Sequence, residues 1–143
     1  MKLLDVNVAL YAYVPEAAEH DRARTWFETL LSGREPVLFP LATLLGFMRI
    51  STDIRVFREP FSVALALDVV ESWLALPHVR IAEPGTVHWR ILRRLAETGQ
   101  TRGASLTDAH IAALAMEHGA DLCTTDRGFA RFAELRTINP LLD

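Results

Sequence analysis

The sequence predicts a layered α/β protein with a mainly parallel central sheet. Short apolar segments of strand length alternate with longer segments whose apolar residues recur at helical spacing, as in parallel sheets with helical crossovers. The chain has 143 residues, half of them hydrophobic, so it can bury a core without disulfide or metal staples. We therefore expect a single domain over residues 1–143, with no internal repeat or low-complexity segment.

Five short strands and seven helices are expected along the chain. Val14-Pro15 and Ser32-Gly33 end the first two helices, Ser62 fits an N-cap, and Gly119 stops the helix before the fourth strand. The expected strands are residues 2–5, 36–40, 79–82, 122–124 and 136–138. The expected helices are residues 6–13, 19–31, 41–50, 62–76, 83–98, 108–118 and 128–134.

Composition narrows the class of protein. The formal net charge is −3, so the chain as a whole has no basic footprint for nucleic acid. Its basic residues are nearly all arginine, with Lys2 the only lysine, which fits either bidentate phosphate contacts or merely the base composition of a genome. The single Cys123 excludes a disulfide framework and favours a reducing, cytoplasmic location. No apolar run is long enough to cross a bilayer, and an aspartate at residue 5 argues against a secretory signal.

Three aspartates occupy comparable positions, each just after a strand or at a helix start beside the sheet. Asp5 ends the first strand, Asp126 follows the fourth, and Asp108 lies at the start of the helix before it. Each has a simple explanation as a helix cap, and Ser105 with Asp108 fits the capping-box pattern. Taken together, however, three carboxylates at one edge of a sheet would repel one another unless a cation screens them.

The donor types indicate which cation would fit. Oxygen ligands without clustered His or Cys favour a hard ion, Mg²⁺ or Mn²⁺, bound by the three aspartates. Asn7, Thr107, Thr124 and Thr125 lie close in sequence to these aspartates, and we expect them to hydrogen-bond to the ligands. The five histidines are scattered and are interpreted as surface or packing residues. No phosphate-cradling glycine loop or nucleophile elbow is present, which argues against serine or cysteine chemistry.

Three ordered motifs resemble those of PIN-domain proteins, and more narrowly of the VapC ribonuclease toxins of type II toxin–antitoxin pairs. They are Leu-Leu-Asp-Val-Asn at residues 3–7, Leu-Thr-Asp-Ala at 106–109 and Thr-Thr-Asp-Arg-Gly-Phe at 124–129. The resemblance spans the whole chain and implies a three-layer α/β/α sandwich with an acidic Mg²⁺ site. It carries over to Asp5, Asp108 and Asp126 as catalytic and metal-binding residues. The chain departs from the family near Leu44, where many PIN domains have a glutamate.

The resemblance implies a Mg²⁺-dependent endoribonuclease, with tRNA among the expected targets. In-line attack by water on the phosphodiester would leave a 5′-phosphate and a 3′-hydroxyl. Because the carboxylates are anionic, the substrate phosphates need a cation, and Arg49 and Arg127 are the candidates. The simpler explanation for both arginines is an ordinary surface ion pair.

The resemblance also implies two protein partners, a cognate VapB-like antitoxin and a second copy of the chain in a homodimer. The apolar helices at 41–50 and 62–76 offer such surfaces, although most of their residues fit burial in the core of the monomer.

Two other functions are consistent with parts of the sequence. A haloacid-dehalogenase-like phosphatase also starts with an aspartate after its first strand, but it needs a second aspartate at Asn7 and a lysine beyond Lys2. A catalytically degenerate PIN fold that acts only as a binding or scaffold module is consistent with the missing acid at Leu44.

Overall fold

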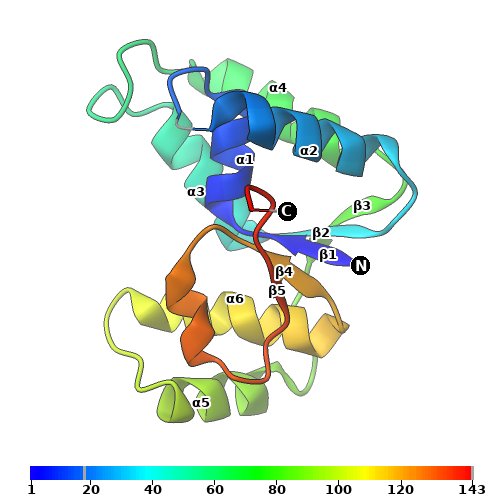
Figure 1. Ribbon diagram of the computed structural model, residues 1–143, viewed down its shortest axis with the longest axis vertical. Helices are drawn as coiled ribbons and strands as arrows, with labels where there is room; N and C mark the ends of the chain where they lie inside the picture. Colours follow the sequence, from blue (N-terminus) through cyan, green and yellow to red (C-terminus); the bar gives the residue numbers. More distant parts are fainter. Residues whose placement is uncertain (18, 143) are drawn as a thin grey trace.

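The computed structural model describes residues 1–17 and 19–142 and contains a five-stranded sheet in which every neighbouring pair is parallel (Figure 1). The strand order is β3-β2-β1-β4-β5, so the first strand lies at the centre of the sheet. The strands are β1 (Lys2–Leu4), β2 (Val37–Pro40), β3 (Val79–Ala82), β4 (Asp121–Cys123) and β5 (Thr137–Ile138). The predicted parallel sheet is confirmed.

Helices cover both faces of this sheet, which confirms the predicted α/β/α sandwich (Figure 1). Four helices lie on one face: α1 (Val6–Tyr13), α2 (His20–Ser32), α3 (Leu41–Ser51) and α4 (Val63–Leu74). On the other face lie α5 (His88–Thr98), α6 (Ser105–His118) and the short 3₁₀ helix η1 (Arg127–Arg131). None of the helices in the described part of the chain combines the length and apolar character that a bilayer-spanning segment needs.

Alternation of side chains along the central strand divides the core into two layers. Leu3 packs toward α6, whereas Leu4 packs toward α1–α4, because successive strand residues point to opposite faces. The layer between the sheet and helices α1–α4 is aromatic, with Phe39 stacked on Trp73 at a centroid distance of 5.0 Å. The layer on the other side of the sheet is lined by α6, where every residue from 109 to 115 except His110 is buried and most of these are alanines. Small side chains let this helix lie close to the sheet, which fixes the position of its first turn.

Two element boundaries differ from the predictions in ways that affect the site. The helix expected from residue 108 begins at Ser105, so Asp108 is the fourth residue of the helix rather than its first. The capping box is not formed, because the Ser105 hydroxyl bonds to the backbone of Arg102 and the N-cap position is Ala104. The helix expected at 128–134 is a five-residue 3₁₀ helix, Arg127–Arg131. The caps predicted at Ser62 and Gly119 are confirmed; Gly119 has the left-handed φ of 66° that favours glycine.

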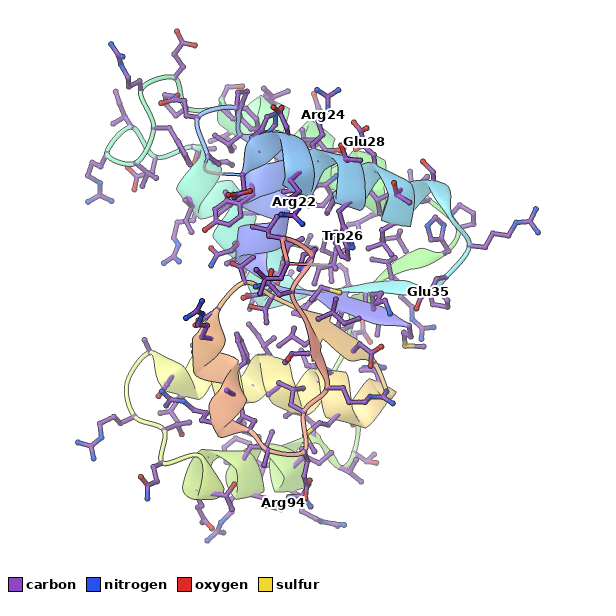
Figure 2. All side chains as sticks on the ribbon, in the orientation of Figure 1. Arg22, Arg24, Trp26, Glu28, Glu35 and Arg94 are labelled. Carbon is purple, nitrogen blue, oxygen red and sulfur yellow. The ribbon has the colours of Figure 1, made fainter. Side chains whose placement is uncertain are left out.

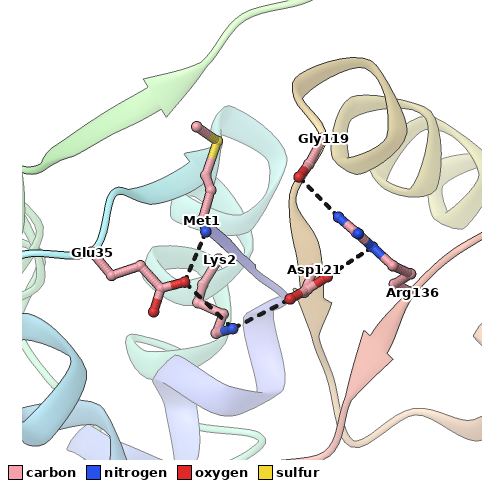
Figure 3. A network of polar contacts seen from close by, with 6 residues as sticks. All are labelled: Met1, Lys2, Glu35, Gly119, Asp121 and Arg136. Atoms are coloured by element: carbon pink, nitrogen blue, oxygen red, sulfur yellow. Dashed lines mark hydrogen bonds and ion pairs between the residues drawn. The ribbon is translucent and has the colours of Figure 1, made fainter.

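The amino ends of the strands are closed by a polar network (Figure 3). Asp121, the first residue of β4, pairs with Lys2 at 3.3 Å and with Arg136 at 2.9 Å, and Lys2 also meets Glu35 at 3.4 Å. Asp121 therefore lies at the opposite end of the sheet from Asp5 and Asp126, as its position in the sequence predicts.

Candidate active site

Asp5 lies at the carboxyl end of the central strand and is 5% exposed. Its backbone N–H donates to the Cys123 carbonyl at 3.0 Å, which continues the β1–β4 pairing and fixes the residue opposite Thr124. Its Oδ1 accepts the Val6 N–H at 2.8 Å, so the cap role expected for Asp5 is confirmed. Burial raises the pKa of Asp5, as does the Asp126 charge, while hydrogen bonds from Thr124 and Val6 oppose the rise.

Thr124 links the two strand-end aspartates. Its hydroxyl donates to Asp5 Oδ2 at 2.7 Å and accepts the backbone N–H of Asp126 at 3.0 Å. Thr124 is buried, so its bond to Asp5 lies away from solvent, whereas its bond with Asp126 is partly buried. The hydrogen bond predicted between Thr124 and Asp5 is present, and the Thr124 hydroxyl couples the orientation of Asp5 to the backbone that carries Asp126.

Asp126 caps the 3₁₀ helix through a tight turn. Its Oδ1 accepts the Gly128 N–H at 2.7 Å, and a Cβ on Gly128 would lie only 3.0 Å from that oxygen. A glycine at this position thus leaves room for the carboxylate to fold back over the turn. Capping uses one lone pair of one oxygen, so it is compatible with a second role for Asp126.

Asp108 is not a cap, contrary to the simple explanation offered by its sequence context. Among the described residues, no hydrogen bond involves its carboxylate, and the first turn of α6 holds it half-buried. Burial raises the pKa of Asp108, and the charges of Asp126 and Asp5 raise it further, while Arg131 lowers it. The three aspartates are therefore close enough to repel one another.

The chemistry of this donor set fits a hard divalent cation. Arg131 is the one cation that lowers the pKa of Asp108 against the charges of Asp126 and Asp5, and oxygen donors are the ligands that Mg²⁺ and Mn²⁺ prefer. Within residues 1–17 and 19–142, however, no three His, Cys, Asp or Glu side chains are grouped closely enough to hold a metal ion.

The side of the site where PIN domains often have a glutamate is apolar in this chain. Leu44 is 3% exposed and belongs to the aromatic core layer. Its neighbour Thr43 donates its hydroxyl to the Leu4 carbonyl at 2.9 Å, so this part of α3 is packed against the end of the central strand. Asp53 does not replace the missing acid, because it forms an ion pair with Arg55 at 3.0 Å.

The other residues expected at the site are less tightly connected to it. Among the described residues, no hydrogen bond joins Asn7, Thr107 or Thr125 to the three carboxylates. Arg49 lies in the last turn of α3, about 12 Å along the helix axis from its first residue. Arg127 lies beside Asp126 and lines an adjoining pocket together with Thr125.

Surface ion pairs account for many arginines but for neither of the two expected to bind substrate. Figure 2 shows Arg24 beside Glu28 on the outside of α2, at 2.9 Å, and Arg94 on α5, which pairs with Glu134 at 2.7 Å. Within the described chain, no ion pair involves Arg49 or Arg127. Both therefore remain candidates for contacts with phosphate.

Arg131 is a candidate that the sequence reasoning missed. It lies at the end of η1, where its Nε donates to the Gly128 carbonyl at 3.2 Å and its charge lowers the pKa of Asp108. The only signal in the sequence is its position five residues after Asp126. That signal becomes interpretable only once the intervening residues are known to form a 3₁₀ helix.

His88 and His110 are packing residues, as interpreted from the sequence, but His88 is not isolated, because the two side chains contact each other. His88 Nε2 lies 2.9 Å from His110 Nδ1, and His88 Nδ1 lies 3.3 Å from Glu117 Oε2. The three side chains join α5 to α6, and burial lowers the pKa of His110. They clamp the helix that carries Asp108, rather than forming a separate catalytic centre.

Cys123 supplies no nucleophile. It is fully buried between the core layers, and this burial raises the pKa of its thiol to about 12, so the thiolate is not formed at neutral pH.

Comparisons with known proteins identify the family. The model of the PIN domain matches residues 2–135. The chain belongs to the PIN-domain family. Within that family it is similar to ribonuclease VapC43 of Mycobacterium tuberculosis, with 41% identity over 141 residues, covering 99% of this chain and 96% of the relative. Ribonuclease VapC31 of the same species is 37% identical over 142 residues, covering 99% and 100% of the two chains.

Solved structures share the PIN fold. FitAcB from Neisseria gonorrhoeae matches with a TM-score of 0.69 and 22% identity over the whole of both chains. VapBC-1 from nontypeable Haemophilus influenzae matches with a TM-score of 0.70 and 16% identity over 97% of each. VapC20 of Mycobacterium tuberculosis, named as a Sarcin-Ricin loop cleaving toxin, matches with a TM-score of 0.65 and 16% identity, covering 95% of this chain and 99% of its own.

Proposed function

We propose that this PIN-domain chain is a divalent-metal-dependent endoribonuclease and the toxin of a VapC-type toxin–antitoxin pair. The observation that carries the proposal is the link through Thr124 between Asp5 and Asp126 at the carboxyl edge of the sheet, with Asp108 near enough for both charges to raise its pKa. Family membership and the ribonuclease relatives support the same reaction class.

Asp5, Asp108 and Asp126 would hold the cation, with Mg²⁺ the expected ion and Mn²⁺ a substitute of the same ligand preference. A bound divalent cation supplies Lewis acidity, which makes water a nucleophile at neutral pH and offsets charge on the phosphate. The Thr124 hydroxyl restricts the Asp5 carboxylate to one orientation. Asp108, whose carboxylate has no hydrogen bond among the described residues, is the ligand that adjusts most easily when a cation binds.

Arginines around the carboxylates would contact the RNA backbone. The charge of Arg131 lowers the pKa of Asp108, and Arg127 belongs to the same 3₁₀ helix. Arg49 would act further out, on a more distant phosphate. In-line attack by water at the phosphodiester then leaves a 5′-phosphate and a 3′-hydroxyl.

The test is cleavage of defined RNAs with Mg²⁺ and with a chelator, comparing the parent with Asp108→Asn. Substrates should include tRNAs, which the family resemblance implies, and a sarcin–ricin-loop oligonucleotide, the target named for the structural neighbour VapC20. We expect 5′-phosphate products from the parent and a loss of about 100-fold or more in the variant. Asp68→Asn is the matched control, because Asp68 is an exposed aspartate of α4. Equal cleavage by the parent and Asp108→Asn would reject the assigned site.

Two protein partners belong to this proposal, a VapB-like antitoxin and a second copy of the chain. Although much of α3 and α4 is buried, each helix leaves large apolar side chains exposed. These are Leu41 and Leu45 on α3, and Val63, Leu65 and Leu67 on α4. Several of the solved PIN-fold neighbours come from VapBC structures, which supports a partner of this kind.

A second candidate function is a catalytically degenerate PIN fold that only binds its partners. The observation in its favour is the buried Leu44 at the position of the family glutamate. Absence of RNA cleavage by the parent with either Mg²⁺ or Mn²⁺, together with retained RNA or antitoxin binding, would favour this function.

A further inference from the structure

A pocket of about 320 Å³ opens directly beside Asp126, between the ends of β4 and β5 and the 3₁₀ helix η1. Pockets that hold small ligands begin at about 300 Å³, so this one suits a single planar group rather than several nucleotides. The residues that matter for recognition are Thr125, Asp126, Arg127, Phe129, Thr137 and Asn139.

One wall of the pocket is apolar. Ala130 contributes its exposed side chain, and beneath it the pocket rests on Phe129, which is buried in the core with its ring 6.2 Å from that of Phe132. An apolar wall on a fixed element suits the flat face of a base, because burial of apolar surface needs no specific hydrogen bond.

The polar groups of the pocket include several hydrogen-bond donors. Asn139 Oδ1 accepts the Leu141 N–H at 3.0 Å. The amide NH₂ of Asn139 is therefore the group of this side chain that can donate to a ligand. In the described residues, no hydrogen bond involves the hydroxyl of Thr125 or Thr137, and Arg127 adds a cation. Asp126 is the one carboxylate among the residues that line the pocket, and it is also one of the three proposed metal ligands.

We propose that this pocket binds one base of the RNA strand, next to the phosphate that the three carboxylates address, and that it prefers guanine or uracil. The inference rests on the proposed ribonuclease function. Guanine and uracil present carbonyl oxygens to a donor such as the Asn139 amide, whereas adenine and cytosine present an exocyclic amino group at the equivalent edge. A base that is splayed out of a single-stranded loop can enter such a pocket edge-first.

The first test measures kcat/KM on four RNAs that differ only in the base next to the mapped cleavage site. We expect the parent to favour guanine and uracil over adenine and cytosine by about 3- to 10-fold, the effect of one net hydrogen bond. Asn139→Asp keeps an oxygen for the Leu141 N–H but replaces the donor with an acceptor, so the preference should disappear or reverse. Because the readout is a ratio between substrates, a uniform loss of rate from the added charge cancels.

Thr137→Val gives a second, structurally mild perturbation, since valine keeps the β-branched shape on β5 and removes only the hydroxyl. It should reduce the base preference by about 2- to 5-fold. Thr86→Val is the matched control, because Thr86 is exposed and lies outside the pocket. Cleavage by the parent with no base preference, or a preference unchanged in Asn139→Asp, would overturn the pocket assignment while leaving the nuclease function intact.

The second test does not depend on activity. Asn7, Gln100 and Asn139 are the only side-chain amides in the sequence, so the Asn139 NH₂ signals can be assigned by substitution in NMR spectra. Titration with GMP or UMP should shift these signals more than titration with AMP or CMP. Equal shifts, or none, would reject the subsite even if no RNA is cleaved, so failure of the subsite and failure of the nuclease function are distinguished.

Discussion

The hydroxyl of Thr124 donates a 2.7 Å hydrogen bond to the carboxylate of Asp5, and the two residues end adjacent parallel strands. The same hydroxyl oxygen accepts the Asp126 N–H. One buried group therefore sets the orientation of one candidate ligand and the backbone position of another.

Replacing Thr124 with valine removes this link and keeps the side-chain shape. We expect apparent Mg²⁺ affinity in the cleavage assay to fall about 10- to 100-fold, as for other partners of metal ligands. We also expect a loss of about 1–3 kcal/mol in the free energy of unfolding, because Asp5 Oδ2 is left buried without its donor. Thr43→Val is the control, since Thr43 donates to the Leu4 carbonyl instead of a carboxylate. It should destabilise the fold with much less effect on metal affinity; equal effects would contradict the role of Thr124.

The pKa of Asp108 predicts a dependence of stability on pH. Burial and the charges of Asp126 and Asp5 raise its pKa in the folded state above the ordinary value of 3.8, which applies to the unfolded state. Between the unfolded-state and folded-state pKa values of Asp108, the folded protein therefore binds more protons than the unfolded protein. Unfolding then releases protons, and this contribution to stability is lost as pH rises above 3.8. Asp108→Asn removes the penalty, and without divalent metal it should raise Tm by about 2–4 °C at pH 7.

That gain should vanish below pH 3.8, where the carboxyl group of the parent is protonated as well. Added Mg²⁺ should raise the Tm of the parent more than that of Asp108→Asn, because only the parent retains all three carboxylates. Thermal unfolding across pH, with and without Mg²⁺, measures both effects. A variant less stable than the parent at pH 7 would show that like-charge repulsion at the site is not significant.

The contact between His88 and His110 predicts a structural effect on α6. His88→Ala removes the side chain that joins His110 to Glu117 and leaves the Glu117 carboxylate poorly solvated, so we expect a loss of about 2–3 kcal/mol. Chemical denaturation measures this loss. Trp89→Ala is the adjacent control, because Trp89 is 74% exposed and should change stability by less than about 0.5 kcal/mol. Similar values for both variants would mean that the cluster does not hold α5 to α6.

Restoring an acid at Leu44 tests whether the site lacks a usable fourth position. Because Leu44 is buried in an aromatic layer, Leu44→Glu should lose about 3–5 kcal/mol of stability and gain no cleavage activity. Leu45→Glu, on the neighbouring position of α3, should be tolerated because Leu45 is 58% exposed. Higher activity in Leu44→Glu would show that this position faces the metal after all.

Much of the fold and part of the site could be predicted from the sequence because they depend on local pattern. Alternating strands and helices gave the parallel sheet, and parallel strands bring Asp5 and Asp126 to the same edge. What could not be predicted depends on contacts between distant segments. His88 and His110 are 22 residues apart, and periodicity does not say which faces of two helices meet. Ser105 fits a capping box, yet its hydroxyl bonds to Arg102, because the chain turns one residue earlier than the pattern indicates.

The most direct test of the central claim is Mn²⁺ binding, followed by electron paramagnetic resonance, in the parent and in the single Asn variants of Asp5, Asp108 and Asp126. We predict that the parent binds Mn²⁺, that Mg²⁺ competes for the same site, and that each variant weakens binding at least about 10-fold. Binding of equal strength in all four proteins would contradict a metal site built from these three carboxylates.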